Sequence, residues 1–170
     1  MSFEKSEFYY KVYGLDVKSE IKIDEFVTIE NINVENKVNI VYSNMPLNIK
    51  EDIKNNKKSS FSKAECWFHI NDVATYRITG GNLIEFEPGE NADPYLLRVF
   101  LMCSCLGFIM IQRDIVAIHG GTIVIDNKAI ILTGNRGAGK STLTTGLRLK
   151  GYPFISDDVA AIEIKDNIPM

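Results

Sequence analysis

The sequence predicts an α/β protein in which a β-rich N-terminal part precedes a core made of a strand, a glycine-rich loop and a helix. Residues 129–149 read AIILTGNRGAGKSTLTTGLRL, an apolar strand that stops at a glycine and continues with helical spacing. The first ninety residues instead carry short aromatic and β-branched runs broken by Gly, Asp or Asn, which is typical of strands. With 170 residues, 45% of them apolar, the chain is long enough to close a core.

Composition narrows the classes of partner and compartment. The net charge is −3 and the lysines are scattered among acids, so no basic face for nucleic acid is expected. The three cysteines, Cys66, Cys103 and Cys105, lack metal-ligand spacing and fit a reducing compartment as free thiols. The amino terminus lacks the apolar core of a signal peptide. We therefore expect a cytoplasmic protein without a zinc site.

The N-terminal half, residues 1–90, is predicted to form a β-rich domain. Gly80-Gly81-Asn82 is a turn that needs positive φ, and Pro46–Ser60 is interpreted as a solvated loop, with a phosphate-binding patch as the sharper alternative. His69 alternates with Trp67 and is taken as structural. The predicted strands are Phe8–Tyr13, Ile21–Ile29, Val38–Tyr42, Cys66–Ile70, Val73–Thr79 and Leu83–Glu87.

A boundary is predicted at Pro88–Pro94, so that residues 91–170 form the second domain. Val99–Ile111 is uncharged but shorter than the ~20 apolar residues that a membrane span requires, and it is predicted to be a buried helix. Asp93 is suited to cap this helix and Pro94 to occupy its first position. No membrane partner is expected.

Two strands then lead towards the glycine-rich loop. Ile115–His119 and Thr122–Ile125 are the apolar runs, and Asp126-Asn127-Lys128 is a predicted hairpin turn. His119 ends its strand just before two glycines. The hairpin either folds His119 back towards the loop or leaves it as a core or turn histidine, and the spacing alone does not decide between these.

The loop itself follows the P-loop, or Walker A, pattern of nucleotide triphosphate sites. Its glycines allow a tight turn and close backbone approaches, so that amide N–H groups and the start of the next helix meet phosphate oxygens. Lys140 would lie along the β- and γ-phosphates, and the Ser141 hydroxyl would complete the shell of a Mg²⁺ ion. The predicted nucleotide-binding residues are Gly134, Asn135, Arg136, Gly137, Ala138, Gly139, Lys140, Ser141 and Thr142.

After the loop helix, two acids follow a short apolar strand. Gly151 can end the helix, and Phe154-Ile155-Ser156 is predicted to run parallel beside the loop strand. Asp157 and Asp158 would then lie at the phosphate edge of the sheet, one holding Mg²⁺ and the other taking a proton. The alternative is a solvated pair of turn acids.

Three segments together resemble the catalytic core of HPr kinase/phosphorylase. They are His119-Gly120, the stretch GNRGAGKST from Gly134 to Thr142, and GYPFISDDV from Gly151 to Val159. The likeness is closest to shorter HPr-kinase-like proteins of peptide-modification systems, including kinases of lasso peptide precursors. There, as here, a β-rich part precedes an apolar helix ending in Gln-Arg, a histidine-glycine strand and the loop; Tyr13-Gly14-Leu15 and Ser19-Glu20 also resemble that subgroup.

This resemblance implies a role for each matching residue. Lys140 would bind phosphates, Ser141 and Asp158 would serve the metal, Asp157 would be the general base towards a serine hydroxyl, and His119 would support that base. The parent family has a further region with an arginine and an acidic metal ligand after the aspartates, whereas this sequence ends at residue 170. We therefore expect a C-terminally incomplete second domain with weak activity on its own.

The expected function is an ATP- and Mg²⁺-dependent kinase acting on a serine hydroxyl of a small protein or peptide. The alternatives are a nucleotide-binding module without catalysis, truncated or regulatory, and a kinase of a free small molecule such as serine. The sequence leaves the acceptor, ATP against GTP, phosphorolysis and homo-oligomerisation open.

Overall fold

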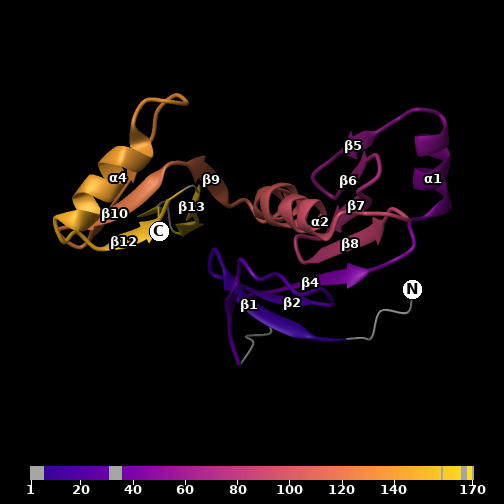
Figure 1. Cartoon of the computed structure of the whole chain (residues 1–170), viewed down its shortest axis with the longest axis horizontal. Helices are drawn as coiled ribbons and strands as arrows, with labels where there is room; N and C mark the ends of the chain where they lie inside the picture. The colour runs from indigo at the N-terminus through magenta and orange to yellow at the C-terminus, as the bar shows by residue number, and fades with distance from the viewer. Residues whose placement is uncertain (1–5, 31–35, 158, 166–167, 170) are drawn as a thin grey trace. The chain divides into compact units, whose positions relative to one another are not determined.

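The computed structural model describes residues 6–30, 36–157, 159–165 and 168–169. It is an α/β protein with one large mixed sheet and few helices (Figure 1). The chain forms two compact units, the first reaching Arg113 and the second beginning at Asp114.

The first unit contains an eight-stranded sheet with the order β3-β1-β2-β4-β8-β7-β6-β5. Strand β4 pairs in parallel with β2 and with β8, whereas the other pairs are antiparallel. The strands are β1 Phe8–Val12, β2 Leu15–Ser19, β3 Val27–Thr28, β4 Lys37–Tyr42, β5 Ser59–Phe61, β6 Glu65–Ile70, β7 Ala74–Thr79 and β8 Leu83–Pro88.

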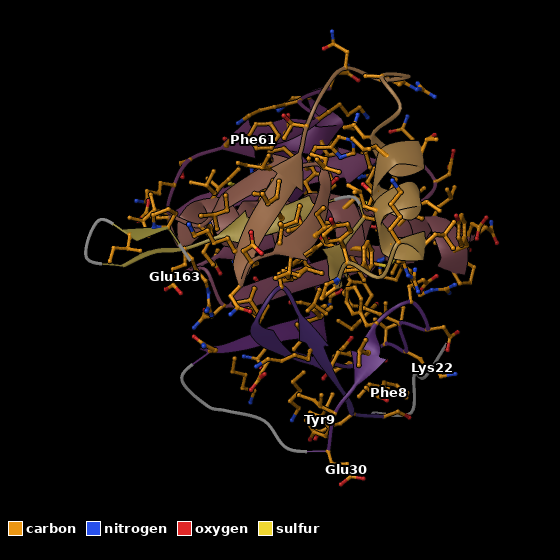
Figure 2. All side chains as sticks on the ribbon, turned by 90° about the vertical axis from the view of Figure 1, so that its left-hand side faces the viewer. Phe8, Tyr9, Lys22, Glu30, Phe61 and Glu163 are labelled. Atoms are coloured by element: carbon orange, nitrogen blue, oxygen red, sulfur yellow. The ribbon has the colours of Figure 1, made fainter. Side chains whose placement is uncertain are left out.

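One long helix packs on this sheet through an aromatic cluster. It comprises α2 (Pro94–Phe100), a π-helical turn η2 (Leu101–Cys105) and α3 (Leu106–Gln112). The ring of Phe68 lies 4.9 Å from that of Tyr76, 6.3 Å from Phe100 and 6.0 Å from Phe108. Phe61, labelled in Figure 2, belongs to β5, the last strand in the sheet order, and its ring stacks on that of Phe108 at a centroid distance of 5.2 Å. The sheet and the helix therefore share one core.

The end of the long helix is tied to the turn between β7 and β8. Gln112 accepts a hydrogen bond from the Gly81 amide (2.8 Å) and donates one to the Ile78 carbonyl (3.1 Å), while Arg113 donates to the Gly81 carbonyl. These bonds place the helix in the first unit, so the two units divide after Arg113 and not at the predicted boundary of Pro88–Pro94.

The helix is also longer than the apolar run Val99–Ile111 from which it was predicted. It spans 19 residues, Pro94–Gln112, and by length and composition alone it would suffice to cross a membrane. Its buried residues include Leu101, Leu106 and Ile109, whereas Ile111 is exposed. The expectation of a buried helix thus holds for one face.

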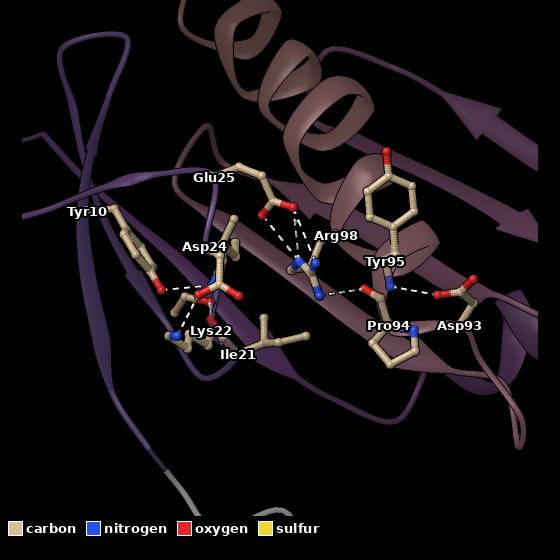
Figure 3. Close-up of polar contacts among 11 residues, drawn as sticks. Tyr10, Ile21, Lys22, Asp24, Glu25, Asp93, Pro94, Tyr95 and Arg98 are labelled. Carbon is tan, nitrogen blue, oxygen red and sulfur yellow. Dashed lines mark hydrogen bonds and ion pairs between the residues drawn. The ribbon is translucent and has the colours of Figure 1, made fainter.

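Two N-terminal predictions are wrong. Ile21–Ile29 is not one strand, because the Ser19 hydroxyl and the Tyr10 hydroxyl bond the backbone of Ile21 and Ile23 and turn the chain. Figure 3 shows this turn held to α2 by Arg98, which pairs with Glu25 at 3.2 Å.

The same figure shows Asp93 accepting from the Tyr95 amide (2.8 Å), which confirms the predicted cap.

Pro46–Ser60 is likewise not a simple loop, since Leu47–Lys54 forms helix α1. Ile49 and Ile53 lie four residues apart and pack on Met45 and Trp67. Helical spacing of these few apolar residues, together with Trp67 as a packing partner, outweighs the polar composition.

In the second unit the described residues form three small sheets and one helix. A three-stranded sheet has the order β11-β10-β12, and β13-β9 and β14-β15 form two pairs. The predicted hairpin turn is confirmed, with Asp126 and Asn127 at positive φ. The elements are β9 Val116–His119, β10 Gly121–Ile125, β11 Lys128–Leu132, α4 Lys140–Leu149, β12 Phe154–Ser156, β13 Val159–Ile162, β14 Ile164–Lys165 and β15 Ile168–Pro169.

The predicted position of Phe154–Ser156 is corrected by this topology. Strand β12 does not lie beside β11, because β10 forms a hairpin with β11 and occupies the space between them. Both β11 and β12 run antiparallel to β10, so they are parallel to each other and end at the same edge of the sheet.

Candidate functional site

The glycine-rich loop connects the end of β11 to the start of α4. Gly137 and Gly139 have φ of +83° and +84°, a region that side chains with a Cβ rarely adopt. Gly139 occupies the N-cap of α4 and offers no capping side chain, so first-turn N–H groups of the helix lack a side-chain partner. The loop from Gly134 to Gly139 is exposed. This geometry suits an anion.

The Lys140 ammonium group lies across this loop. It donates to the carbonyl oxygens of Gly134 at 2.8 Å and Asn135 at 3.2 Å. A cation is thus held at the inner side of the loop, where it adds to the positive end of the helix. Ser141 and Thr142 follow in the first turn of α4, and both are exposed.

Two glycines at the start of β10 let the loop, the helix and the sheet pack closely. A Cβ on Gly120 would lie 2.5 Å from the Leu132 carbonyl oxygen at the end of β11. A Cβ on Gly121 would overlap the hydroxyl of Thr144, a residue of α4 that is 2% exposed and donates to the Lys140 carbonyl at 2.9 Å. The backbone of β10 at Gly121 is therefore in direct contact with α4 at Thr144.

The strand register brings Asp157 and His119 to this same place. Ser156 pairs with Thr122 in the β10–β12 ladder, and Val159 pairs with His119 in the β9–β13 ladder. Asp157 lies in the segment that connects these two ladders, opposite Gly120 and Gly121. Gly121 in turn pairs with Leu132, the last residue of β11. Two strand spacings, about 10 Å, thus separate the end of β11 from the chain around Asp157.

The side chains at this point are less organised than the backbone. His119 and Asp157 are both exposed, and neither side chain hydrogen-bonds another residue in the part of the chain that the structure describes. The predicted support of Asp157 by His119 is therefore not present as a direct bond between the two side chains.

A hydroxyl pair lies just before Asp157, and the sequence analysis missed it. Ser156 donates from Oγ to Oγ1 of Thr122 at 3.1 Å, and Thr122 is 3% exposed. Thr144 and Gly121 were missed as well. Small and hydroxyl residues have no strong sequence pattern of their own, so the sequence does not single them out.

The arginines differ in whether other residues already bind their side chains. Four of the five in the sequence are engaged: Arg77 pairs with Glu65 and Glu85, Arg98 with Glu25, Arg113 binds backbone carbonyls, and Arg148 stacks 5.2 Å from the Phe154 ring. Arg136, in the glycine-rich loop, is exposed and has no ion pair with the described residues.

The predicted metal ligands are Ser141 and Asp158. Asp158 lies outside the described residues, and among those described no cluster of three His, Cys, Asp or Glu side chains could hold a metal ion. A hard cation with phosphate and water ligands needs few protein oxygens, and the Ser141 hydroxyl beside the loop fits that requirement.

Apolar side chains are exposed around the three-stranded sheet. Strand β11 pairs only with β10 among the described residues, and Ile130 on it is 40% exposed. Ile155 on β12 is 58% exposed, and Leu143 and Leu149 on α4 are 53% and 83% exposed. A hollow of about 440 Å³ lies along α4 and is lined by Gly139, Thr142, Leu143, Gly146, Leu147 and Lys150.

Comparison of the chain with protein-family models, curated proteins and solved structures gives no significant match. The functional argument therefore depends on the site alone.

Proposed function

We propose that the chain is an ATP- and Mg²⁺-dependent kinase of the HPr-kinase-like type that transfers the γ-phosphoryl group to a serine hydroxyl of a small protein or peptide. The observation that carries the proposal is the register at one edge of the second unit. There the glycine-rich loop, His119-Gly120 and Asp157 converge from three strands and one helix.

In the proposed reaction the loop binds and orients the triphosphate. Amide groups around Gly137 and Gly139 would contact phosphate oxygens, and Lys140 would leave the Gly134 carbonyl to lie along the β- and γ-phosphates. Ser141 would hold Mg²⁺, which neutralises phosphate charge when bound. Binding at an uncapped helix start also removes the cost of unsatisfied N–H groups.

Asp157 is proposed to receive the proton of the acceptor hydroxyl. As the serine oxygen bonds to the γ-phosphorus, the bond from that phosphorus to the β–γ bridging oxygen breaks and ADP leaves. Asp157 is exposed, so an acceptor from solution can reach it without opening a lid. His119 pairs with Val159, two residues after Asp157. It is proposed to act on Asp157 only once acceptor or nucleotide is bound.

A non-catalytic nucleotide-binding module is the second candidate. It is favoured by the absence of side-chain hydrogen bonds on Asp157 and His119 among the described residues, since a catalytic base is usually oriented by a neighbour. The exposed apolar residues of β11 and β12 also favour slow transfer by this chain when it acts alone.

Transfer can be tested by incubating the chain with ATP, Mg²⁺ and a pool of serine-containing peptides or free serine, followed by intact-mass measurement. A gain of about 80 Da on a peptide supports the proposal, and a gain on free serine selects the small-molecule alternative. Nucleotide binding without any mass gain, in wild type and Asp157→Asn alike, would favour the non-catalytic module.

A further inference from the structure

We propose that Thr122 and Ser156 form a positioning pair that sets the side chain of Asp157 towards the glycine-rich loop. The proposal rests on the proposed kinase function and adds to it two residues that do not touch nucleotide. It starts from the hydroxyl-to-hydroxyl bond of 3.1 Å between β12 and β10.

The backbone pairing between β10 and β12 is irregular next to this bond. Thr122 pairs with Ser156 and Ile123 with Phe154, so Ile155 is an extra residue and the register shifts between Thr122 and Ile123. A bulge of this kind bends the strand and re-aims the side chains that follow it. The side-chain bond therefore adds to the Thr122–Ser156 backbone pair, which the bulge separates from the rest of the β10–β12 ladder.

The two faces of β10 give this bond a direction. Gly121 faces α4, because a Cβ there would overlap Thr144, so the next residue, Thr122, faces the opposite side of the sheet. Ser156 bonds Thr122 and lies on that opposite side as well. Asp157 follows directly in the bend after β12, and the bond holds the residue before it, so we propose that the bond sets the Asp157 side chain to the side of α4 and the loop.

The bond is also well placed to hold its geometry. Thr122 is 3% exposed, and the β12 chain is anchored on its other end by the Val124 amide, which donates to the Pro153 carbonyl at 2.8 Å. Loss of the hydroxyl leaves this anchor and the loop untouched. The end of β12 is then held to β10 only by its backbone pairing, and Asp157 is held less firmly.

Thr122→Val, which keeps the shape and removes the hydroxyl, tests the pair by its effect on transfer and on nucleotide affinity. We expect kcat to fall about tenfold while the Kd for Mg²⁺–ATP changes less than about twofold, since misplacing a catalytic group lowers the rate and not the binding. Ser156→Ala should match it, and Thr122→Ser should restore the rate. In an Asp157→Asn background, Thr122→Val should change nothing further.

Thr75→Val is the matched control, because Thr75 is a strand threonine of the first unit, 6% exposed, whose hydroxyl bonds His69 at 2.8 Å. It removes an equivalent bond and should leave kcat unchanged. An equal loss in Thr75→Val, or a further loss in the Asp157→Asn background, would show a general structural effect and overturn the proposal.

An NMR titration keeps the test independent of turnover. On addition of Mg²⁺–ATP, the amide signals of Gly137 and Gly139 should move in wild type and in Thr122→Val, whereas the response of the Asp157 amide should be lost in the variant. If the loop signals do not move in wild type, nucleotide binding itself fails. If they move and Asp157 responds equally in both proteins, or in neither, the positioning role is refuted.

Discussion

Replacing Gly121 with alanine should displace the helix that follows the glycine-rich loop. The added Cβ would overlap Oγ1 of Thr144 and lie 3.0 Å from its Cβ and Cγ2. Thr144 cannot simply rotate away, because it is buried and bonded to the Lys140 carbonyl. The helix must then move off β10 by about 1 Å, and overpacking of this kind costs roughly 1–3 kcal/mol.

Two further substitutions in the same helix sharpen this test. Gly146 has no atom within 4 Å of an added Cβ, so Gly146→Ala should be neutral or stabilising by about 0.5–1 kcal/mol. Thr144→Ala removes the clashing hydroxyl and should recover part of the stability lost in Gly121→Ala. The two changes should therefore be strongly non-additive.

Because the chain has two compact units, stability should be read for the second unit by amide hydrogen exchange in α4, not from a single melting curve. Calorimetric titration with Mg²⁺–ATP then reports whether the helix shift reaches the loop. Unchanged exchange and unchanged nucleotide affinity in Gly121→Ala would refute the idea that the β10 backbone positions α4.

The remaining predictions concern charge. Arg136→Ala should lower phosphoryl transfer by roughly 10³-fold if this exposed arginine neutralises the transferring group, whereas Arg148→Ala, at the Phe154 ring, should change it little; equal effects would reject the assignment. Asp157→Asn should retain ATP binding and lose at least ~10²-fold in transfer, and undiminished transfer would exclude it as the base. Burial, and to a smaller extent the charge of Lys58, lowers the pKa of His69 below its ordinary 6.5. Just below pH 6.5, His69 therefore binds a proton in the unfolded chain but not in the folded chain. Stability of the first unit should thus fall as pH drops below 6.5, a slope that His69→Gln should abolish in denaturant titrations.

Elements whose conformation is decided locally were predictable from sequence. The Asp93 cap, the Asp126-Asn127 hairpin turn, Gly80-Gly81 at positive φ and the end of α4 at Gly151 were all found as expected. Each depends on residues a few positions apart. Which strand pairs with β11, in contrast, depends on a choice between segments far apart in the sequence. Strand β10 is connected to β11 by a two-residue turn and therefore pairs with it.

The candidate site was predictable only in its parts. The loop pattern and the two acids are contiguous motifs, and the register confirms that β11 and β12 end at one edge. The hydroxyl pair and the contact of Gly121 with Thr144 were not predictable, because they join segments more than twenty residues apart through small side chains. The turn within Ile21–Ile29 has a different cause, because hydroxyl contacts from Ser19 and Tyr10 to the backbone override the strand-like composition of this segment.

Calorimetric titration of the chain with Mg²⁺–ATP, in wild type and in Lys140→Ala, tests the central claim most directly. Lys140 lies on the loop carbonyls of Gly134 and Asn135, so removing its charge should weaken binding tenfold or more, about 1.4 kcal/mol for each factor of ten. Lys150→Ala, an exposed lysine just beyond the other end of α4, is the matched control and should bind as wild type does. Equal affinity in wild type and Lys140→Ala, or no binding by either, would contradict a nucleotide site at this loop.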